Sequence, residues 1–128
     1  MILPGNEANT LPKVIYEELD GTIHISGRSV SPEVNEYFDE FIPYLEECLS
    51  KKPMNLQLDL DFEYFNTKTA RLLAKLFITV RSVKDHGYTA KVNWYYDMGD
   101  DDLLESGEDY ASFTKLEFTL IEKPEKPE

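Results

Sequence analysis

The chain has 128 residues and a formal net charge of −12, with 41% hydrophobic and 30% charged residues. This length and balance are typical of one globular domain that is large enough to bury a core. The acidic excess argues against a nucleic-acid partner, which needs a basic surface, and against docking on a membrane of anionic lipid. No apolar run is long enough to span a membrane and no signal peptide is visible, so a cytoplasmic location is expected.

The first part of the chain predicts a hairpin followed by a helix. Residues 1–12 are mixed in character and are expected to form a loose N-terminal segment. Residues 13–17 and 22–26 read as two strands, and Asp20-Gly21 between them is a strong hairpin signal. Ser31-Pro32-Glu33 then predicts a helix start, because serine caps helices and proline suits the first helical position.

An apolar stripe at helical spacing continues this helix from Val34 to Leu49. Cys48 is the only cysteine of the chain and falls on the stripe. We therefore expect no internal disulfide and a buried, unreactive thiol in the core.

The rest of the chain alternates strands with helices. In order we expect a strand over 56–62, a helix from 67 to about 85, a strand over 90–95, a short helix that begins near Asp100 and is stopped by Gly107, and a strand over 116–120. Residues 122–128 are charged and proline-rich, which predicts a disordered tail. The order β-β-α-β-α-β-α-β indicates one α/β domain over 13–121, with a mixed sheet of about five strands and helices mainly on one face.

The junction between the third strand and the second helix contains a hydroxyl in a distinctive place. Thr67 falls at or just before a helix N-terminus, where free N–H groups and the helix dipole favour negative charge. A phosphate on Thr67 would meet these donors, and the cations Lys68, Arg71 and Lys75 follow at once. The simpler alternative is that Asn66 or Thr67 only caps the helix.

Acidic side chains form two groups that could hold a divalent cation or carry out acid–base catalysis. The groups are Asp59, Asp61 and Glu63 on one strand face, and Asp97, Asp100, Asp101 and Asp102 later in the chain. Their spacing matches no EF-hand loop, and a solvated strand face with charges at a helix start is the simpler interpretation. We therefore expect no cofactor and no metal, with a small acidic metal-binding domain or enzyme as an alternative.

Several motifs, taken together, resemble the SiaC family of bacterial regulatory phosphoproteins over about residues 13–120. They are Ile25-Ser26-Gly27-Arg28-Ser29 with Pro32-Glu33, Glu63-Tyr64-Phe65-Asn66-Thr67, Val92-Asn93-Trp94-Tyr95-Tyr96-Asp97, Asp101-Asp102 and Gly107-Glu108-Asp109. The resemblance implies a single regulatory domain with a fold like the STAS domains of anti-sigma-factor antagonists.

The same resemblance implies a function in partner switching. In the family a dedicated Ser/Thr kinase phosphorylates the protein, and a PP2C-like phosphatase reverses the modification. The unphosphorylated form binds and activates a diguanylate cyclase, which links the family to cyclic-di-GMP signalling and biofilm regulation. The acceptor threonine maps to Thr67. The family usually continues with a serine run, whereas Lys68-Thr69 follows here, and this makes Thr69 a second candidate acceptor.

The predicted function is therefore a non-enzymatic signalling switch. The effector would dock around the helix start through Asn66, Lys68, Arg71 and Lys75. Two residues elsewhere complete the expected docking set: Arg28, whose planar fork suits a phosphate, and Tyr95, as an aromatic anchor. An anti-sigma-factor antagonist with a different partner is the alternative within the same class.

Overall fold

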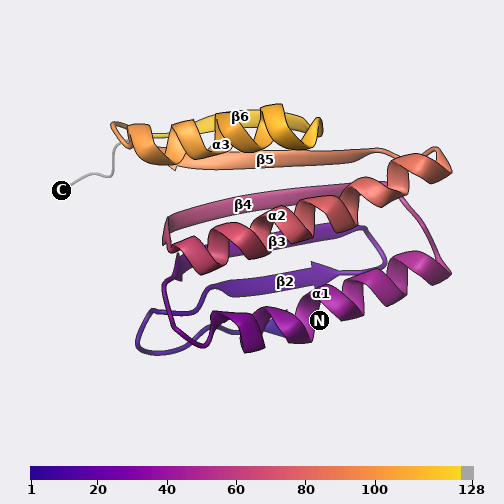
Figure 1. Cartoon of the computed structure of the whole chain (residues 1–128), viewed down its shortest axis with the longest axis horizontal. Coiled ribbons are helices and arrows are strands. Elements are labelled where there is room, and N and C mark those ends of the chain that lie inside the picture. The colour runs from indigo at the N-terminus through magenta and orange to yellow at the C-terminus, as the bar shows by residue number, and fades with distance from the viewer. Residues whose placement is uncertain (125–128) are drawn as a thin grey trace.

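The computed structural model describes residues 1–124 and contains a six-stranded sheet with three α-helices lying across one of its faces (Figure 1). In chain order the elements are β1 (Ile2–Leu3), β2 (Lys13–Glu17), β3 (Thr22–Ser29), α1 (Val34–Lys51), β4 (Leu56–Phe65), α2 (Thr67–Arg81), the 3₁₀ helix η1 (Ser82–His86), β5 (Ala90–Asp97), α3 (Asp101–Thr114) and β6 (Glu117–Lys123). The strands lie side by side in the order of the sequence, from β1 to β6.

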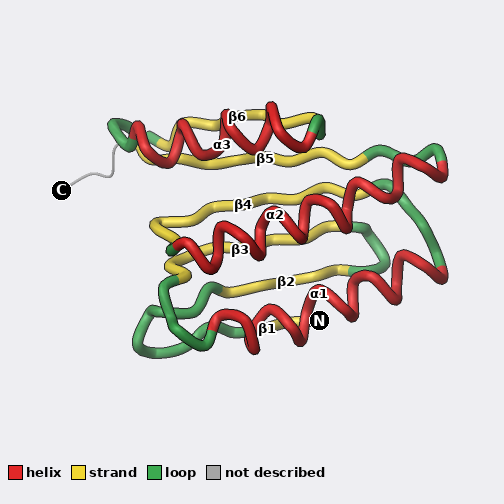
Figure 2. The backbone as a smooth tube through the Cα atoms, in the orientation of Figure 1, coloured by secondary structure: helices red, strands yellow, loops and turns green. Residues whose placement is uncertain are grey.

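The sheet is mixed: its first strands are joined by short connections and its later strands by helices (Figure 2). β1, β2 and β3 pair antiparallel, whereas β3, β4, β5 and β6 pair parallel. Parallel neighbours need a crossover, and α1, α2 and α3 supply the three crossovers on the same face. The predicted α/β class with helices on one face is confirmed, with six strands rather than about five.

Both ends of the domain extend further into the sheet than expected. The segment expected to be loose contains β1, in which Ile2 pairs with Ile15, and the Met1 ammonium donates to the Tyr16 carbonyl at 2.8 Å. A strand of two residues is too short for its side chains to reveal a period of two. At the other end β6 runs through Lys123, so the first residues of the expected tail are paired in the sheet. The rest of that prediction, residues 125–128, lies outside the described residues.

Two helix boundaries differ from the sequence expectation. α1 begins at Val34, because Ser31 caps only a local turn in which its hydroxyl accepts from the Glu33 N–H at 3.0 Å. α3 continues through Gly107 to Thr114, and Gly107 is buried inside the helix rather than ending it. A glycine at that position reads as a stop signal, but here it allows close packing on the sheet.

The core lies between the helices and the covered face of the sheet. Strands contribute alternate side chains and helices contribute one stripe each, as the two periodicities require. The largest fully buried side chains are Trp94, Tyr16, Phe38, Phe41, Phe62, Phe77, Ile23, Ile25, Ile42, Leu45, Leu58 and Leu60. No described helix covers the opposite face, where the intervening residues of each strand lie. Within residues 1–124, no helix is both long enough and apolar enough to cross a membrane.

Candidate phosphoacceptor and docking site

The β4–α2 junction is fixed by Asn66, which joins a strand end to a helix start. Its backbone N–H donates to the Ser29 carbonyl at 3.0 Å, which ties the junction to the end of β3. Its side-chain oxygen accepts from the Thr69 N–H at 2.9 Å and so caps α2. The N-cap is therefore Asn66, and Thr67 is the first residue of the helix.

Thr67 and Thr69 occupy opposite environments although they are two residues apart. Thr67 is exposed, and within residues 1–124 its hydroxyl makes no hydrogen bond. Thr69 is 0% exposed, and its hydroxyl contacts Ser29 Oγ at 2.7 Å, the Ser29 carbonyl at 3.0 Å and Asn66 Oδ1 at 2.9 Å. The hydroxyl of Thr69 is therefore part of the core of the junction, and only that of Thr67 is accessible to a kinase in this conformation.

The start of α2 can accept a negative charge at Thr67. Among the described residues, the N–H groups of Thr67 and Lys68 have no acceptor, as is usual in the first turn of a helix. Arg71 follows Thr67 by one helical turn and projects on the same side. Lys68, Arg71 and Lys75 are all exposed, and none of them forms an ion pair within residues 1–124.

Charge is distributed in stripes over the helix layer. α2 contains four cations and no carboxylate, whereas α1 and α3 beside it contain five carboxylates each. Because the whole chain has a net charge of −12, a basic helix between two acidic ones is a local exception. A negatively charged surface would therefore be attracted to α2 more than to the helices beside it.

A shallow hollow of about 140 Å³ adjoins the junction, and its α3 side was not expected from the sequence. Its walls come from Glu63, Tyr64, Phe65, Asp100, Asp102, Leu103 and Ser106. The start of α3 reaches this place because β4 and β5 are parallel, so that their carboxyl ends lie at the same edge of the sheet. The rule that parallel strands end at the same edge of a sheet could have predicted from the sequence that the turn at Asp100 lies near Thr67.

The remaining docking candidates do not all lie with Thr67. Arg28 stands at the same end of the sheet, where its guanidinium lies 5.9 Å from the ring centroid of Tyr64. Tyr95 follows the buried Trp94 in β5 and therefore points to the uncovered face, away from α2. The structure thus places Asn66, Lys68 and Arg71 at the start of α2 and Arg28 at the same end of the sheet, whereas Tyr95 lies on the uncovered face.

Two of the carboxylates considered as metal ligands, Asp59 and Asp61, have protein partners. Asp59 accepts from Asn93 at 2.7 Å and lies 3.1 Å from His24 Nδ1, and Asp61 accepts from the Lys123 ammonium at 2.6 Å. In the described part of the chain, no three His, Cys, Asp or Glu side chains are grouped so that they could hold a metal ion.

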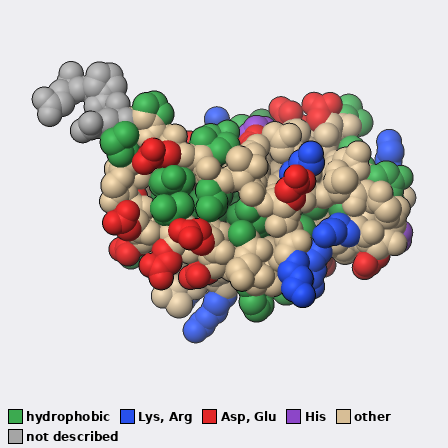
Figure 3. All heavy atoms as spheres, turned by 90° about the horizontal axis from the view of Figure 1, so that it is seen from above, with side chains coloured by type: hydrophobic (Ala, Val, Ile, Leu, Met, Phe, Trp, Pro, Cys, Tyr) green, Lys and Arg blue, Asp and Glu red, His purple; other side chains and the backbone are tan. Residues whose placement is uncertain are grey.

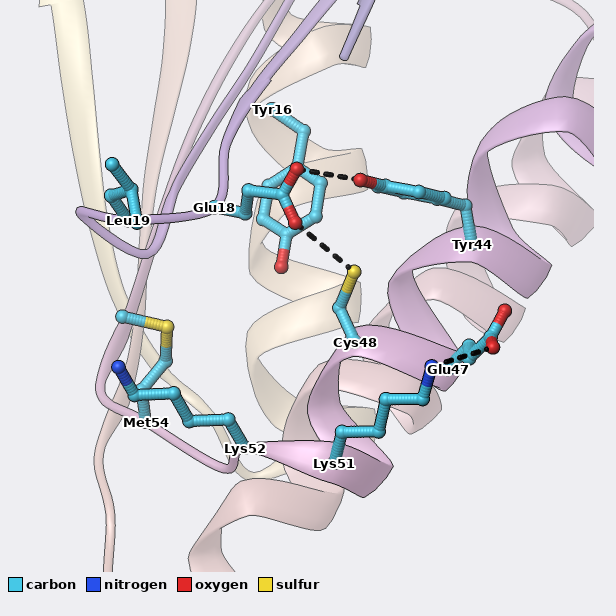
Figure 4. Close-up of a pocket in the computed structure, with 9 residues that line it drawn as sticks. All are labelled: Tyr16, Glu18, Leu19, Tyr44, Glu47, Cys48, Lys51, Lys52 and Met54. Atoms are coloured by element: carbon cyan, nitrogen blue, oxygen red, sulfur yellow. Dashed lines mark hydrogen bonds and ion pairs between the residues drawn. The ribbon is translucent and has the colours of Figure 1, made fainter.

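A separate pocket of about 430 Å³ lies between the β2–β3 turn and the end of α1, far from Thr67 in the fold (Figure 4). Here Tyr44 donates to one oxygen of Glu18 at 2.5 Å, and Cys48 donates to the other at 3.4 Å. Cys48 is thus half-buried at a pocket wall rather than in the core. Burial, followed by the hydrogen bond to Glu18, raises the pKa of its thiol, which keeps it protonated and weakly nucleophilic.

Solved structures with the same fold come from Pseudomonas aeruginosa. The crystal structure of the diguanylate cyclase SiaD in complex with its activator SiaC matches with a TM-score of 0.87 and 20% identity, over 96% of this chain and 99% of the matched chain. A structure of SiaC matches with a TM-score of 0.85 and 20% identity, over 96% and 98%. At these identities the likeness establishes the fold.

Sequence comparison extends to nearly the whole chain. A protein of Pseudomonas aeruginosa (strain UCBPP-PA14) that is described as uncharacterised is 21% identical over 118 residues, which is 92% of each chain. The family model described as SiaC family regulatory phosphoprotein matches residues 6–123. The chain therefore belongs to the SiaC family of regulatory phosphoproteins.

Proposed function

We propose that this protein is a non-enzymatic switch that binds and activates a diguanylate cyclase when Thr67 is unphosphorylated and releases it when Thr67 is phosphorylated. A cognate Ser/Thr kinase and a PP2C-like phosphatase would set the state. Family membership and the fold shared with a cyclase activator support the choice of partner. The observation that carries the choice of residue is the contrast between the exposed Thr67 hydroxyl and the buried Thr69 hydroxyl.

The proposed switch acts through local electrostatics. A phosphate adds about two negative charges at neutral pH, and the free N–H groups of Thr67 and Lys68 with the Arg71 guanidinium would hold them at the helix start. The Arg71 guanidinium is then neutralised and is no longer available to an acidic surface of the effector. The charge and bulk of the phosphate also oppose burial in an interface, so the effector dissociates without any refolding of the domain.

Reconstitution with the purified diguanylate cyclase of the same organism tests the proposal. Cyclic-di-GMP formation from GTP is measured while wild-type protein, Thr67→Ala or Thr67→Asp is titrated in. We expect wild type and Thr67→Ala to stimulate the cyclase and Thr67→Asp to stimulate it much less. Ser112→Asp is the matched control, because it adds the same charge at an exposed position of α3.

Two outcomes would contradict the proposal. If Thr67→Asp, Ser112→Asp and the kinase-phosphorylated protein all stimulated the cyclase equally, the proposed charge mechanism would be wrong. The phosphorylated protein is included because aspartate carries less charge than a phosphate. Full labelling of Thr67→Ala by the kinase, read by mass spectrometry of the intact protein, would remove the assignment of the acceptor. Capture of a sigma-factor regulator in place of the cyclase would favour the anti-sigma-factor antagonist.

A further inference from the structure

The far end of α2 presents a second surface that the switch does not use. A hollow of about 470 Å³ lies there, lined by Ile78, Arg81, Ser82, Lys84, Asp85 and Lys115. Given the rise per residue of an α-helix, Arg81 stands about 20 Å along the helix axis from Thr67. The hollow is therefore at the opposite end of α2 from the phosphoacceptor.

Two large apolar side chains are exposed at this end of the helix layer: Ile78 lines the hollow, and Phe113 lies in the last turn of α3. Ile78 is 56% exposed and Phe113 is 71% exposed. Ile78 precedes Arg81 by three residues, and Arg81 donates to the Thr114 carbonyl of α3 at 3.1 Å. Phe113 adjoins Thr114 in the last turn of α3, so both apolar residues lie close to the point where Arg81 joins α2 to α3. We call Ile78, Arg81, Lys84, Phe113 and Lys115 the basic–apolar patch.

The patch is positively charged, whereas the molecule as a whole is negatively charged. Three cations, Arg81, Lys84 and Lys115, face one carboxylate, Asp85, in the lining of the hollow, although the whole chain has a net charge of −12. Within residues 1–124 none of the three cations forms an ion pair. In the space-filling view, acidic side chains gather at the end of the face from which the grey C-terminal residues extend, and the larger group of basic ones lies toward the other end (Figure 3).

We propose that the basic–apolar patch binds an acidic segment of a partner protein, with large apolar side chains of that segment packed against Ile78 and Phe113. Cations around an apolar centre give such a segment both attraction and an anchor. A symmetric contact with a second copy is disfavoured, because it would bring the three cations against themselves. A nucleic acid is disfavoured by the repulsion of the acidic remainder of the surface.

This surface acts independently of the phosphoacceptor. A segment bound at the patch leaves the Thr67 end of α2 uncovered, so the same partner remains bound in both phosphorylation states. The patch thus provides a constitutive attachment point, while the opposite end of the helix is switched. The inference does not depend on the identity of the effector.

Selection of peptides from a random library tests the chemistry of the partner directly. Phage-displayed peptides of about 15 residues, or roughly four helical turns, are selected on the full-length chain. Binders to a Lys84→Glu/Phe113→Ser/Lys115→Glu variant are removed. We expect enriched sequences that combine Asp or Glu with Leu, Ile, Phe or Trp. Enrichment of neutral or basic sequences, or no enrichment at all, would overturn the proposal.

Affinities of the most enriched peptide, labelled with a fluorophore, then locate its site. We expect a loss of at least about fivefold for Phe113→Ser and about tenfold for Lys84→Glu/Lys115→Glu. Ile78→Ser serves as a second apolar variant if Phe113→Ser folds poorly. Matched controls are Leu19→Ser and Lys13→Glu, an exposed apolar and an exposed basic residue outside the patch, which should change affinity less than about twofold.

The same peptide separates this proposal from the phosphorylation switch. Thr67→Asp should bind it with wild-type affinity, whatever its effect on a diguanylate cyclase. Equal loss in the control variants and the patch variants would show that the peptide binds elsewhere, and the proposal would then be wrong.

Discussion

Gly107 of α3 lies directly against the indole ring of Trp94 in β5. A Cβ atom built on Gly107 would stand 2.5 Å from Trp94 Cδ1, 2.7 Å from Trp94 Nε1 and 2.9 Å from Leu120 Cδ2. The indole N–H also donates to the Leu103 carbonyl at 2.9 Å, so the ring is held from the helix side as well. Gly107 is thus required for contact between α3 and the sheet.

Gly107→Ala should therefore destabilise the domain even though alanine is the better helix former. Overpacking a tight contact costs about 1–3 kcal/mol, and the gain in helix propensity offsets up to about 1 kcal/mol. We expect a net loss of about 1–2 kcal/mol in the free energy of unfolding, measured by urea denaturation. Ser112→Ala, at an exposed position of the same helix, should change it by less than about 0.5 kcal/mol.

The two threonines of the α2 start should differ sharply in stability measurements. Thr69→Val removes a buried hydroxyl that contacts both Ser29 and Asn66, and it leaves their polar atoms without that partner. A loss of about 1–3 kcal/mol in the free energy of unfolding is expected. Thr67→Val, at the exposed position, should cost less than about 0.5 kcal/mol. Similar losses for both variants would contradict the described hydrogen bonds.

Stability should fall in alkaline solution because of Tyr16 and Tyr110. Burial raises the pKa of Tyr16 from 10.0 to about 12, with the neighbouring Cys48 and Glu18 adding to the effect, and burial raises the pKa of Tyr110 to about 12. The folded state therefore holds these protons more tightly than the unfolded state. The corresponding stability is fully present below pH 10 and is lost as the pH rises toward 12.

Urea denaturation across that pH range measures the loss. Wild type should lose up to about 2 kcal/mol for each of these tyrosines. Tyr16→Phe should show a shallower pH dependence than wild type, because its share of the proton linkage is removed. Tyr64→Phe, at a 57% exposed position, is the control for the loss of a tyrosine hydroxyl. A slope that is the same in Tyr16→Phe would argue against this assignment.

Lys123 should stabilise the C-terminal edge of the sheet through Asp61 and Asp97. Burial alone would lower the pKa of Lys123, but the hydrogen bond to Asp61 and the charges of both carboxylates outweigh it and raise that pKa. Because the carboxylates are partly exposed, Lys123→Met should cost only about 0.5–1 kcal/mol. The difference from wild type should shrink in concentrated NaCl. Lys13→Met, at an exposed strand position, is the matched control.

Local sequence patterns were sufficient for the β4–α2 junction. Alternation over 56–62 and the helical stripe after Thr67 are both determined within a few residues, and the N-cap is made by the adjacent Asn66. The fold class followed from the order of strands and helices, because parallel strands need crossovers. These features depend on neighbours in the sequence or on rules common to all sheets.

Features that depend on distant pairing were not predictable from the sequence. β1 is recognisable only by its pairing with β2, and the end of β6 by its pairing with β5 and by the Lys123–Asp61 bond across 62 residues. From the sequence alone Gly107 predicts the end of a helix. Its actual role depends on the indole ring of Trp94, which it contacts. Tyr95 could be placed on the correct face only by knowing which face the helices cover.

The order of the strands has a consequence for how the protein is made. Because neighbours in the sheet are neighbours in the chain, each strand that leaves the ribosome finds its partner already synthesised. The contacts of Thr69 with Ser29 and Asn66 need only the chain up to α2, whereas the Trp94–Gly107 contact needs α3. The hydrogen bonds of the turn that contains Thr67 can therefore form in a nascent chain before the last helix and strand have been translated.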